Sequence, residues 1–272
     1  MTTSTAPRAV AALATAAVVL TLTSCGGQAD PPASAPAPDL PRGSEPVDLD
    51  PAGFTAGSDH RYFPLEPGHR WTYREIAPGD PPLRVVVTVT SRTRRIANGI
   101  EARVVRDTVT ERGEVVEDTF DWYAQDADGN VWYLGEDTAE FDDGRVTTRE
   151  GSFEAGADGA LPGLIMPAEP EVGAHYRQEY AEGEAEDEGE VLALGQQATV
   201  PAGHFTGTLL TADTIPLEPR VLEYKLYAAG DGLVLTLDVS GGAGREELRD
   251  SRTVGEDVAG AAGTTALGQP YL

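Results

Sequence analysis

The chain contains 272 residues, and its 45 acidic against 20 basic side chains give it a formal net charge of −25. Glycine and proline are abundant and cysteine occurs once, which excludes a coiled coil, a collagen-like rod, a disulfide-rich scaffold and a cysteine-based zinc site in the folded part. Nucleic acid is a poor partner for such a chain, because a polyanion is bound by a basic surface.

The amino-terminal segment has the order of regions found in secretory signals. Residues 1–8 carry one positive charge, and residues 9–23 are apolar or small without any charge. This apolar stretch is too short to cross a hydrocarbon core of about 30 Å as a helix, which rises about 1.5 Å per residue. It matches the central region of a signal peptide, so we expect residues 1–24 to be removed from the mature protein.

The signal ends in Leu22-Thr23-Ser24-Cys25, which resembles the lipobox of bacterial lipoproteins, and Cys25 is the only cysteine in the sequence. In that family the thiol is alkylated by a diacylglycerol and the chain is cut just before it. The resemblance implies that Cys25 carries acyl chains such as palmitate and anchors the protein in the cell membrane, on its extracytoplasmic face. Two such chains anchor a protein stably, whereas one is marginal. The alternative is an ordinary signal peptide with an incidental cysteine.

Residues 25–58 are rich in proline, alanine and glycine and contain one aromatic side chain. No helical or strand period is visible in them. Such a composition is typical of an extended, semi-rigid linker, so we expect a flexible tether between the membrane and the folded domain.

From residue 59 onward, short segments dense in β-branched and aromatic residues alternate with turns, which is typical of strands. Glu111-Arg112-Gly113 and Asp142-Asp143-Gly144 are hairpin signals. The predicted strands are 84–90, 101–110, 114–125, 131–134, 174–181, 188–194, 204–215, 220–229, 232–240 and 244–250. We expect one all-β domain over residues 59–250, a single antiparallel curved sheet forming a half-barrel or barrel. Residues 251–272, rich in Gly, Ala and Thr, are expected to form a flexible tail.

Residues 151–172 are predicted to form a long irregular loop, because glycine and proline recur through them. The loop carries apolar side chains that are unusual on a surface. It could plug the concave face of the sheet, or it could cover a cavity for an apolar ligand. Two tryptophans on predicted strands favour core packing but could also form a shelf for a ligand. The candidate ligand-binding residues are Leu161, Leu164, Ile165, Met166, Trp122 and Trp132.

Two segments resemble a group of uncharacterised bacterial lipoproteins of actinobacterial type. Phe63 to Tyr73 matches an F-P-L-x-x-G-x-x-W-x-Y opening, and Tyr227 to Val234 matches a closing Y-A-x-G-x-G-L-V strand pair. The resemblance implies a curved antiparallel sheet. It adds no catalytic residue, because the group has no established activity.

Residue patterns typical of enzymes are missing from the sequence. There is no G-x-S-x-G nucleophile motif, and Ser240 to Gly244 lacks the spacing of a phosphate-binding loop. The four histidines (His60, His69, His175 and His204) are not spaced as zinc ligands. Paired carboxyls could serve glycoside hydrolysis, but no pair stands out among 45 acids. We therefore expect a protein that is not an enzyme and has no cofactor.

Two acidic segments of the sequence are candidate calcium sites. Asp126 to Asn130 begins like an EF-hand loop, but Val131 and Asp137 occupy positions that require Gly and Glu, so a tight turn is the better prediction. The acidic run from Glu182 to Glu190 is either a solvated loop or a weak calcium site. Two functional hypotheses remain: a membrane-anchored carrier of an apolar ligand, and a structural lipoprotein that binds an envelope protein instead.

Overall fold

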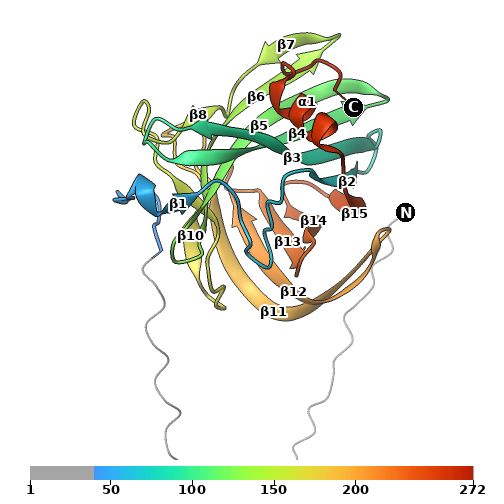
Figure 1. Ribbon diagram of the computed structural model, residues 1–272. Coiled ribbons are helices and arrows are strands. Elements are labelled where there is room, and N and C mark those ends of the chain that lie inside the picture. Colours follow the sequence, from blue (N-terminus) through green and yellow to red (C-terminus); the bar gives the residue numbers. More distant parts are fainter. Residues whose placement is uncertain (1–39, 272) are drawn as a thin grey trace, which may run out of the picture. The chain divides into compact units, whose positions relative to one another are not determined.

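Figure 1 shows the computed structural model, which describes residues 40–271. The signal peptide, Cys25 and the first part of the predicted tether lie outside the described residues. Residues 40–271 form a single antiparallel sheet of fifteen strands and one α-helix. No helix in this part of the chain is long and apolar enough to span a bilayer.

Consecutive hairpins build one half of the sheet. Its strands are β2 (His69–Ile76), β3 (Leu83–Arg95), β4 (Glu101–Glu111), β5 (Glu114–Asp126), β6 (Val131–Asp142) and β7 (Arg145–Thr148). Arg112 and Gly113 between β4 and β5 have φ angles of 51° and 92°, and Asp143 and Gly144 between β6 and β7 have 49° and 71°. Tight hairpin turns whose twist matches their strands require such positive φ angles. Both predicted hairpins are therefore confirmed.

The other half is built in the same way from the carboxyl-terminal part of the chain. Its strands are β10 (His175–Arg177), β11 (Glu188–Val200), β12 (Gly203–Thr214), β13 (Leu222–Ala228), β14 (Gly232–Ser240) and β15 (Arg245–Thr253). β15 pairs with β2 and joins the halves, giving the order β10-β11-β12-β13-β14-β15-β2-β3-β4-β5-β6-β7. The predicted curved antiparallel sheet is confirmed. It stays open, with β10 and β7 at its ends, so the barrel alternative is wrong.

Bulges give the sheet its curvature. The pairing of β11 with β12 shifts register three times between Val191 and Gln197, and each shift bends the strands and increases their twist. Figure 1 shows β11 and β12 as a long bent pair. The bend leaves one face of the sheet concave.

Residues 151–172 are more regular than predicted. They contain two short strands that pair with β6, namely β8 (Phe153–Glu154) and β9 (Gly163–Met166). At Gly163 a Cβ atom would lie 2.0 Å from the carbonyl oxygen of Gln178, so only glycine allows this close approach. The glycine that suggested an irregular loop is thus a requirement of close strand packing.

The predicted tether is wrong at its carboxyl-terminal end, because residues 40–58 belong to the folded domain. They contain the 3₁₀ turn η1 (Pro51–Gly53) and β1 (Phe54–Thr55), which pairs with β5. The buried guanidinium of Arg177 donates to the carbonyl oxygens of Gly43 and Glu45 at 2.5 and 2.8 Å. The apolar side chains of this segment that pack against the core are Leu40, Val47, Leu49 and Phe54.

The predicted flexible tail, residues 251–272, is also ordered over its described part. β15 continues to Thr253, and α1 (Glu256–Thr264) lies across β3 and β4 (Figure 1). Ala259 and Ala262 of α1 are buried. Small side chains let a helix approach a sheet closely, so the Gly/Ala composition that suggested fraying forms a packing face.

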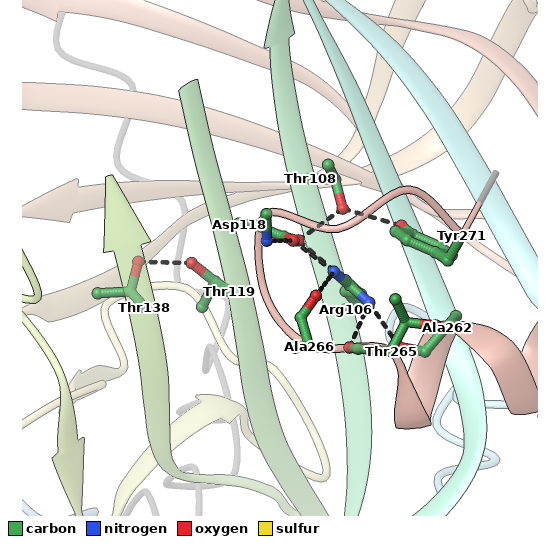
Figure 2. Close-up of polar contacts among 10 residues, drawn as sticks. Arg106, Thr108, Asp118, Thr119, Thr138, Ala262, Thr265, Ala266 and Tyr271 are labelled. Carbon is green, nitrogen blue, oxygen red and sulfur yellow. Dashed lines mark hydrogen bonds and ion pairs between the residues drawn. The ribbon is translucent and has the colours of Figure 1, made fainter. Parts of the chain in front are cut away.

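A buried ion pair holds the end of the chain on the convex face (Figure 2). Arg106 and Asp118 are both fully buried and form a bidentate pair. Arg106 also donates to the carbonyl oxygens of Ala262 (3.1 Å), Thr265 (2.9 Å) and Ala266 (3.1 Å). Asp118 accepts from the backbone NH of Gly268 at 2.7 Å, and Thr108 Oγ1 lies 2.8 Å from Asp118 Oδ1 and 2.9 Å from Tyr271 Oη. The tail thus completes the hydrogen bonding of two buried charges.

Replacing Arg106 by methionine should destabilise the mature protein by about 3–5 kcal/mol, because the variant leaves the Asp118 carboxylate buried without a cation. Urea unfolding followed by circular dichroism measures the change. Arg149→Met is the matched control, since Arg149 forms a half-exposed pair with Asp137 and should cost less than about 1 kcal/mol. Equal losses in the two variants would contradict the role given to the buried pair.

Candidate functional site

The concave face of the sheet encloses a partly open cavity of about 260 Å³, here called the chamber. Strands β2 to β5 and β13 to β15 contribute to its wall, together with residues 63–65 and one residue of β9. Its aromatic side chains are Phe63, Trp71, Tyr73, Tyr123 and Tyr227, and its ionisable side chains are Asp107, Asp121, Lys225 and Glu246. Its remaining lining residues are Pro64, Leu65, Val87, Val105, Ile165, Gly232 and Leu233.

The two-residue period of the strands explains why these side chains meet. On β4, Val105 and Asp107 point into the chamber while Arg106 between them points to the convex face and binds the tail. The strand register places Asp107 beside Val87 of β3, and Val105 beside Asp121 of β5. One strand therefore supplies a cation to one face and a carboxyl group to the other.

Asp121 belongs to a group of three side chains that share protons. The Tyr133 hydroxyl lies 2.7 Å from Asp121 Oδ1 and 2.7 Å from Glu136 Oε2, and the two acids are directly opposite on β5 and β6. A phenol has one proton to donate, so two such short contacts require a second proton on one carboxyl. Burial raises the pKa of both acids, and for Glu136 the charge of Asp121 raises the pKa further.

Asp107 and Glu246 are the other two acids of the chamber wall. Burial raises the pKa of Asp107 well above its usual value, and the charge of Asp121 adds to this effect. The Oδ1 atom of Asp107 is buried and has no hydrogen-bond partner among the described residues. Burial, followed by the charge of Glu75, raises the pKa of Glu246 to about 7. These acids therefore hold protons at pH values where exposed carboxyls are ionised.

Lys225 is the one cation of the chamber wall, and two carboxylates compensate it. Its Nζ atom lies 2.9 Å from Asp213 Oδ2 and 3.5 Å from Glu223 Oε2. Burial alone would lower the pKa of Lys225, but the two carboxylates raise it above its usual value. Next to this cluster, burial also raises the pKa values of Glu179 and Asp187. The site as a whole thus carries more acids than it can neutralise.

The structure places one of the six predicted ligand-binding residues, Ile165, in the chamber wall. Leu164 and Met166, its neighbours on β9, are fully buried in the core, and Leu161 is half-buried with its backbone bridged to Tyr180. The segment is therefore a strand of the sheet that contributes Ile165 to the chamber wall.

The two predicted tryptophans lie away from the chamber. Trp122 is buried on the other face of β5, where the guanidinium of Arg94 lies 4.0 Å from its ring centre. Trp132 is buried and donates from Nε1 to Asp126 Oδ2 at 2.7 Å. Both side chains pack in the domain, as the simpler interpretation of the sequence predicted.

The chamber acids were missed because nothing in the sequence distinguishes them from surface acids. The only available signal is the alternation in Val105-Arg106-Asp107 and Asp121-Trp122-Tyr123, where polar and apolar residues share a face. Once the neighbouring strands are known to enclose a space, this alternation places an acid inside it.

The two possible calcium segments differ from metal sites. Asp126 Oδ1 accepts from the backbone NH groups of Asp128 and Asn130 at 3.0 and 2.9 Å, so the predicted tight turn is confirmed. In the acidic run from Glu182 to Glu190, Asp187 is partly buried whereas Glu182 is exposed. Within residues 40–271 no group of three or more His, Cys, Asp or Glu side chains is arranged to hold a metal ion.

Comparisons with known proteins give a fold-level similarity. No protein-family model matches the sequence, and no curated protein is significantly similar to it. A Bacteroides fragilis structure described as a "putative exported protein with YmcC-like fold" is 15% identical, with a TM-score of 0.43, and the alignment covers 71% of this chain and 100% of that one. A "putative lipoprotein" from Parabacteroides distasonis is 12% identical, with a TM-score of 0.39 and coverage of 71% and 99%. These neighbours identify no function for the chain, and its actinobacterial-type family stays a prediction.

The buried acids should make the protein less stable as the pH rises. A carboxyl group whose pKa is higher in the folded than in the unfolded state binds more protons when folded, so stability falls between the two pKa values. For Glu246 this window runs from about 4.5 to about 7. His60 and His69, whose pKa values burial lowers, act in the opposite sense, but the acids outnumber them.

Glu246→Gln should therefore stabilise the mature protein at pH 8 by on the order of 2 kcal/mol and leave its stability at pH 4.5 nearly unchanged. Urea unfolding at both pH values measures the difference. Glu190→Gln, which removes an exposed acid, serves as the control and should change neither value. An identical effect of Glu246→Gln at the two pH values would show that Glu246 is ionised throughout.

Proposed function

We propose that this protein is a lipid-anchored, extracytoplasmic binding protein that holds a small molecule in the chamber without transforming it. The location rests on the sequence, because a signal peptide over residues 1–24 ends at the sole cysteine, Cys25. A diacylglycerol on Cys25 would hold the domain at the outer face of the cell membrane.

The chamber is the observation that carries the binding role. An open space in a protein core costs free energy, because the side chains around it lose packing contacts. The fully buried apolar side chains of the domain include Ile96, Ile100, Leu134, Leu164, Met166, Leu209 and Leu248. The chamber volume of about 260 Å³ is just below the usual range of about 300–1,000 Å³ for ligand pockets. It therefore suits a small molecule.

The composition of the wall supports binding over catalysis. No serine, histidine or cysteine lines the chamber, so the wall offers no serine or cysteine nucleophile with a histidine base. Asp121 and Glu136 bind the same Tyr133 hydroxyl. The two carboxyls of a glycosidase instead face each other across an open cleft.

Native mass spectrometry of the mature protein, released from the membrane in mild detergent, should show a discrete added mass that disappears on denaturation. Val87→Phe and Ile165→Phe both fill the chamber and should abolish the added mass, because both side chains line the wall. Val146→Phe changes an exposed residue and should retain it. If the wild-type protein carries no added mass at any collision energy, the structural alternative without a small-molecule ligand is favoured.

Cys25→Ser should shift the protein from the membrane fraction to the soluble fraction, because serine cannot form the thioether that carries the acyl chains. Fractionation and immunoblotting measure the distribution. Ser24→Ala keeps a small residue before the cysteine and should leave the protein on the membrane. A Cys25→Ser protein that stayed entirely membrane-bound would exclude the lipid anchor.

A further inference from the structure

We infer that the ligand of the chamber is a small organic cation, an ammonium group attached to an apolar carbon skeleton. This inference rests on the proposed binding function and names the class of its ligand. Four observations on the chamber wall support it: the balance of charge, an unpaired carboxyl oxygen, the aromatic side chains and the lack of a metal geometry.

The charge balance of the wall favours a cation. Asp107, Asp121 and Glu246 line the chamber with no basic partner of their own, because the single cation, Lys225, is paired with two other acids behind it. A bound cation would stabilise the ionised forms of these acids, whereas a bound anion would oppose their ionisation. A neutral apolar ligand would displace water from the acids without offering them a hydrogen bond, which is costly in a buried site.

Asp107 offers a specific contact point. Its Oδ1 atom is buried and unpaired among the described residues, although the residue lines open space. A buried acceptor without a hydrogen-bond partner costs free energy, and an N–H donor bound in the chamber would give the Asp107 carboxyl group a partner. An ammonium group brings up to three N–H donors and the charge that an ionised Asp107 lacks.

The aromatic side chains favour the same ligand. Trp71 Nε1 donates to the Asp231 carbonyl, and the Tyr73 hydroxyl donates to the Leu233 carbonyl at 3.0 Å. The N–H of Trp71 and the O–H of Tyr73 are thus already used by the backbone and are not free to bind an anion. Ring faces attract ammonium groups that have lost part of their water. The rings can also cover the carbon skeleton of the ligand.

A metal ion fits the chamber less well than an organic cation. The described residues contain no cluster of three metal-binding side chains, whereas calcium takes six to eight oxygen ligands. The volume of about 260 Å³ is also far larger than a bare ion needs. A wall of mostly aromatic and aliphatic side chains with three carboxyl groups suits a ligand that is apolar over most of its surface.

Cation binding should release protons, because the carboxyls hold them in the empty chamber. The ionisable groups around Asp107 come from five strands: Tyr73 on β2, Asp121 and Glu117 on β5, Lys225 and Tyr227 on β13, Glu246 on β15, and Glu136 on β6 behind Asp121. A cation stabilises their ionised forms. Affinity should therefore increase as the pH rises from 6 to 8, by up to about tenfold per pH unit for each proton released.

The test is isothermal titration calorimetry of the mature protein with three probes of one length: hexylamine, hexanol and hexanoate. We expect hexylamine to bind at least about tenfold more tightly than hexanol, and hexanoate not to bind. Asp107→Asn should weaken hexylamine binding about tenfold and leave hexanol binding unchanged. Asp128→Asn, the same change on an exposed turn, is the matched control and should alter neither.

Several results would overturn the inference. Equal affinities for hexylamine and hexanol, no binding of hexylamine at millimolar concentration, or unchanged hexylamine binding in Asp107→Asn would each exclude a cation-selective chamber. If Asp107→Asn does not fold, Asp121→Asn and the pH dependence of wild-type binding provide the same test. A neutral or anionic molecule in the native mass spectrum, lost in Val87→Phe, would reject the cation and keep the binding function. A ligand-free spectrum would reject the binding function itself.

Discussion

A carboxyl group removed from water must either keep its proton or face a cation, and both faces of this sheet are organised by that constraint. On the convex face, Asp118 meets Arg106, and the tail of the chain supplies the remaining hydrogen bonds. On the concave face, Asp107 and Asp121 meet no cation within the described residues and depend on protons instead. On the convex face a buried cation compensates the carboxylate, whereas on the concave face the carboxyl groups remain neutral by keeping their protons.

Because the chamber acids depend on protons, the charge of the concave face is sensitive to pH and to a bound ligand. The carboxylate of Asp118 is already compensated by Arg106. The protonated acids around the chamber change charge when the pH or the occupant of the chamber changes. Leaving Asp107 Oδ1 unpaired among the described residues costs free energy, and a bound ligand would give this carboxyl group a partner.

Local sequence signals predicted the strands and the turns well. The Asp-Gly and Arg-Gly pairs at residues 143–144 and 112–113 gave the correct hairpins, because positive φ angles are a property of the turn residues themselves. The tether and the tail were wrong because their order depends on distant partners. Arg177 holds residues 43 and 45, and Arg106 holds residues 262–266. No local pattern reveals which arginine will be buried or what it will bind.

Local sequence patterns reveal even less about the chamber, because its wall is built from distant strands. Ile165 lies in the chamber wall because its segment pairs with β6 as β9, and its role in ligand binding stays a prediction. The acids could not be selected among 45, because their chemistry comes from burial, and burial comes from strands that are far apart in the sequence. Asp107 of β4 and Glu246 of β15 share a cavity only because β15 pairs with β2.

The position of β15 also sets the order of assembly. In the sheet it is the strand between β14 and β2, yet it follows all the other strands in the sequence. The two runs of hairpins can form from nearby residues, but their joining requires one long-range closure late in the process, and such closures slow folding. Until then β2 and β14 are unpaired edges that can bind other chains. Before this closure, the chain is therefore more open to association with other chains than the completed sheet is.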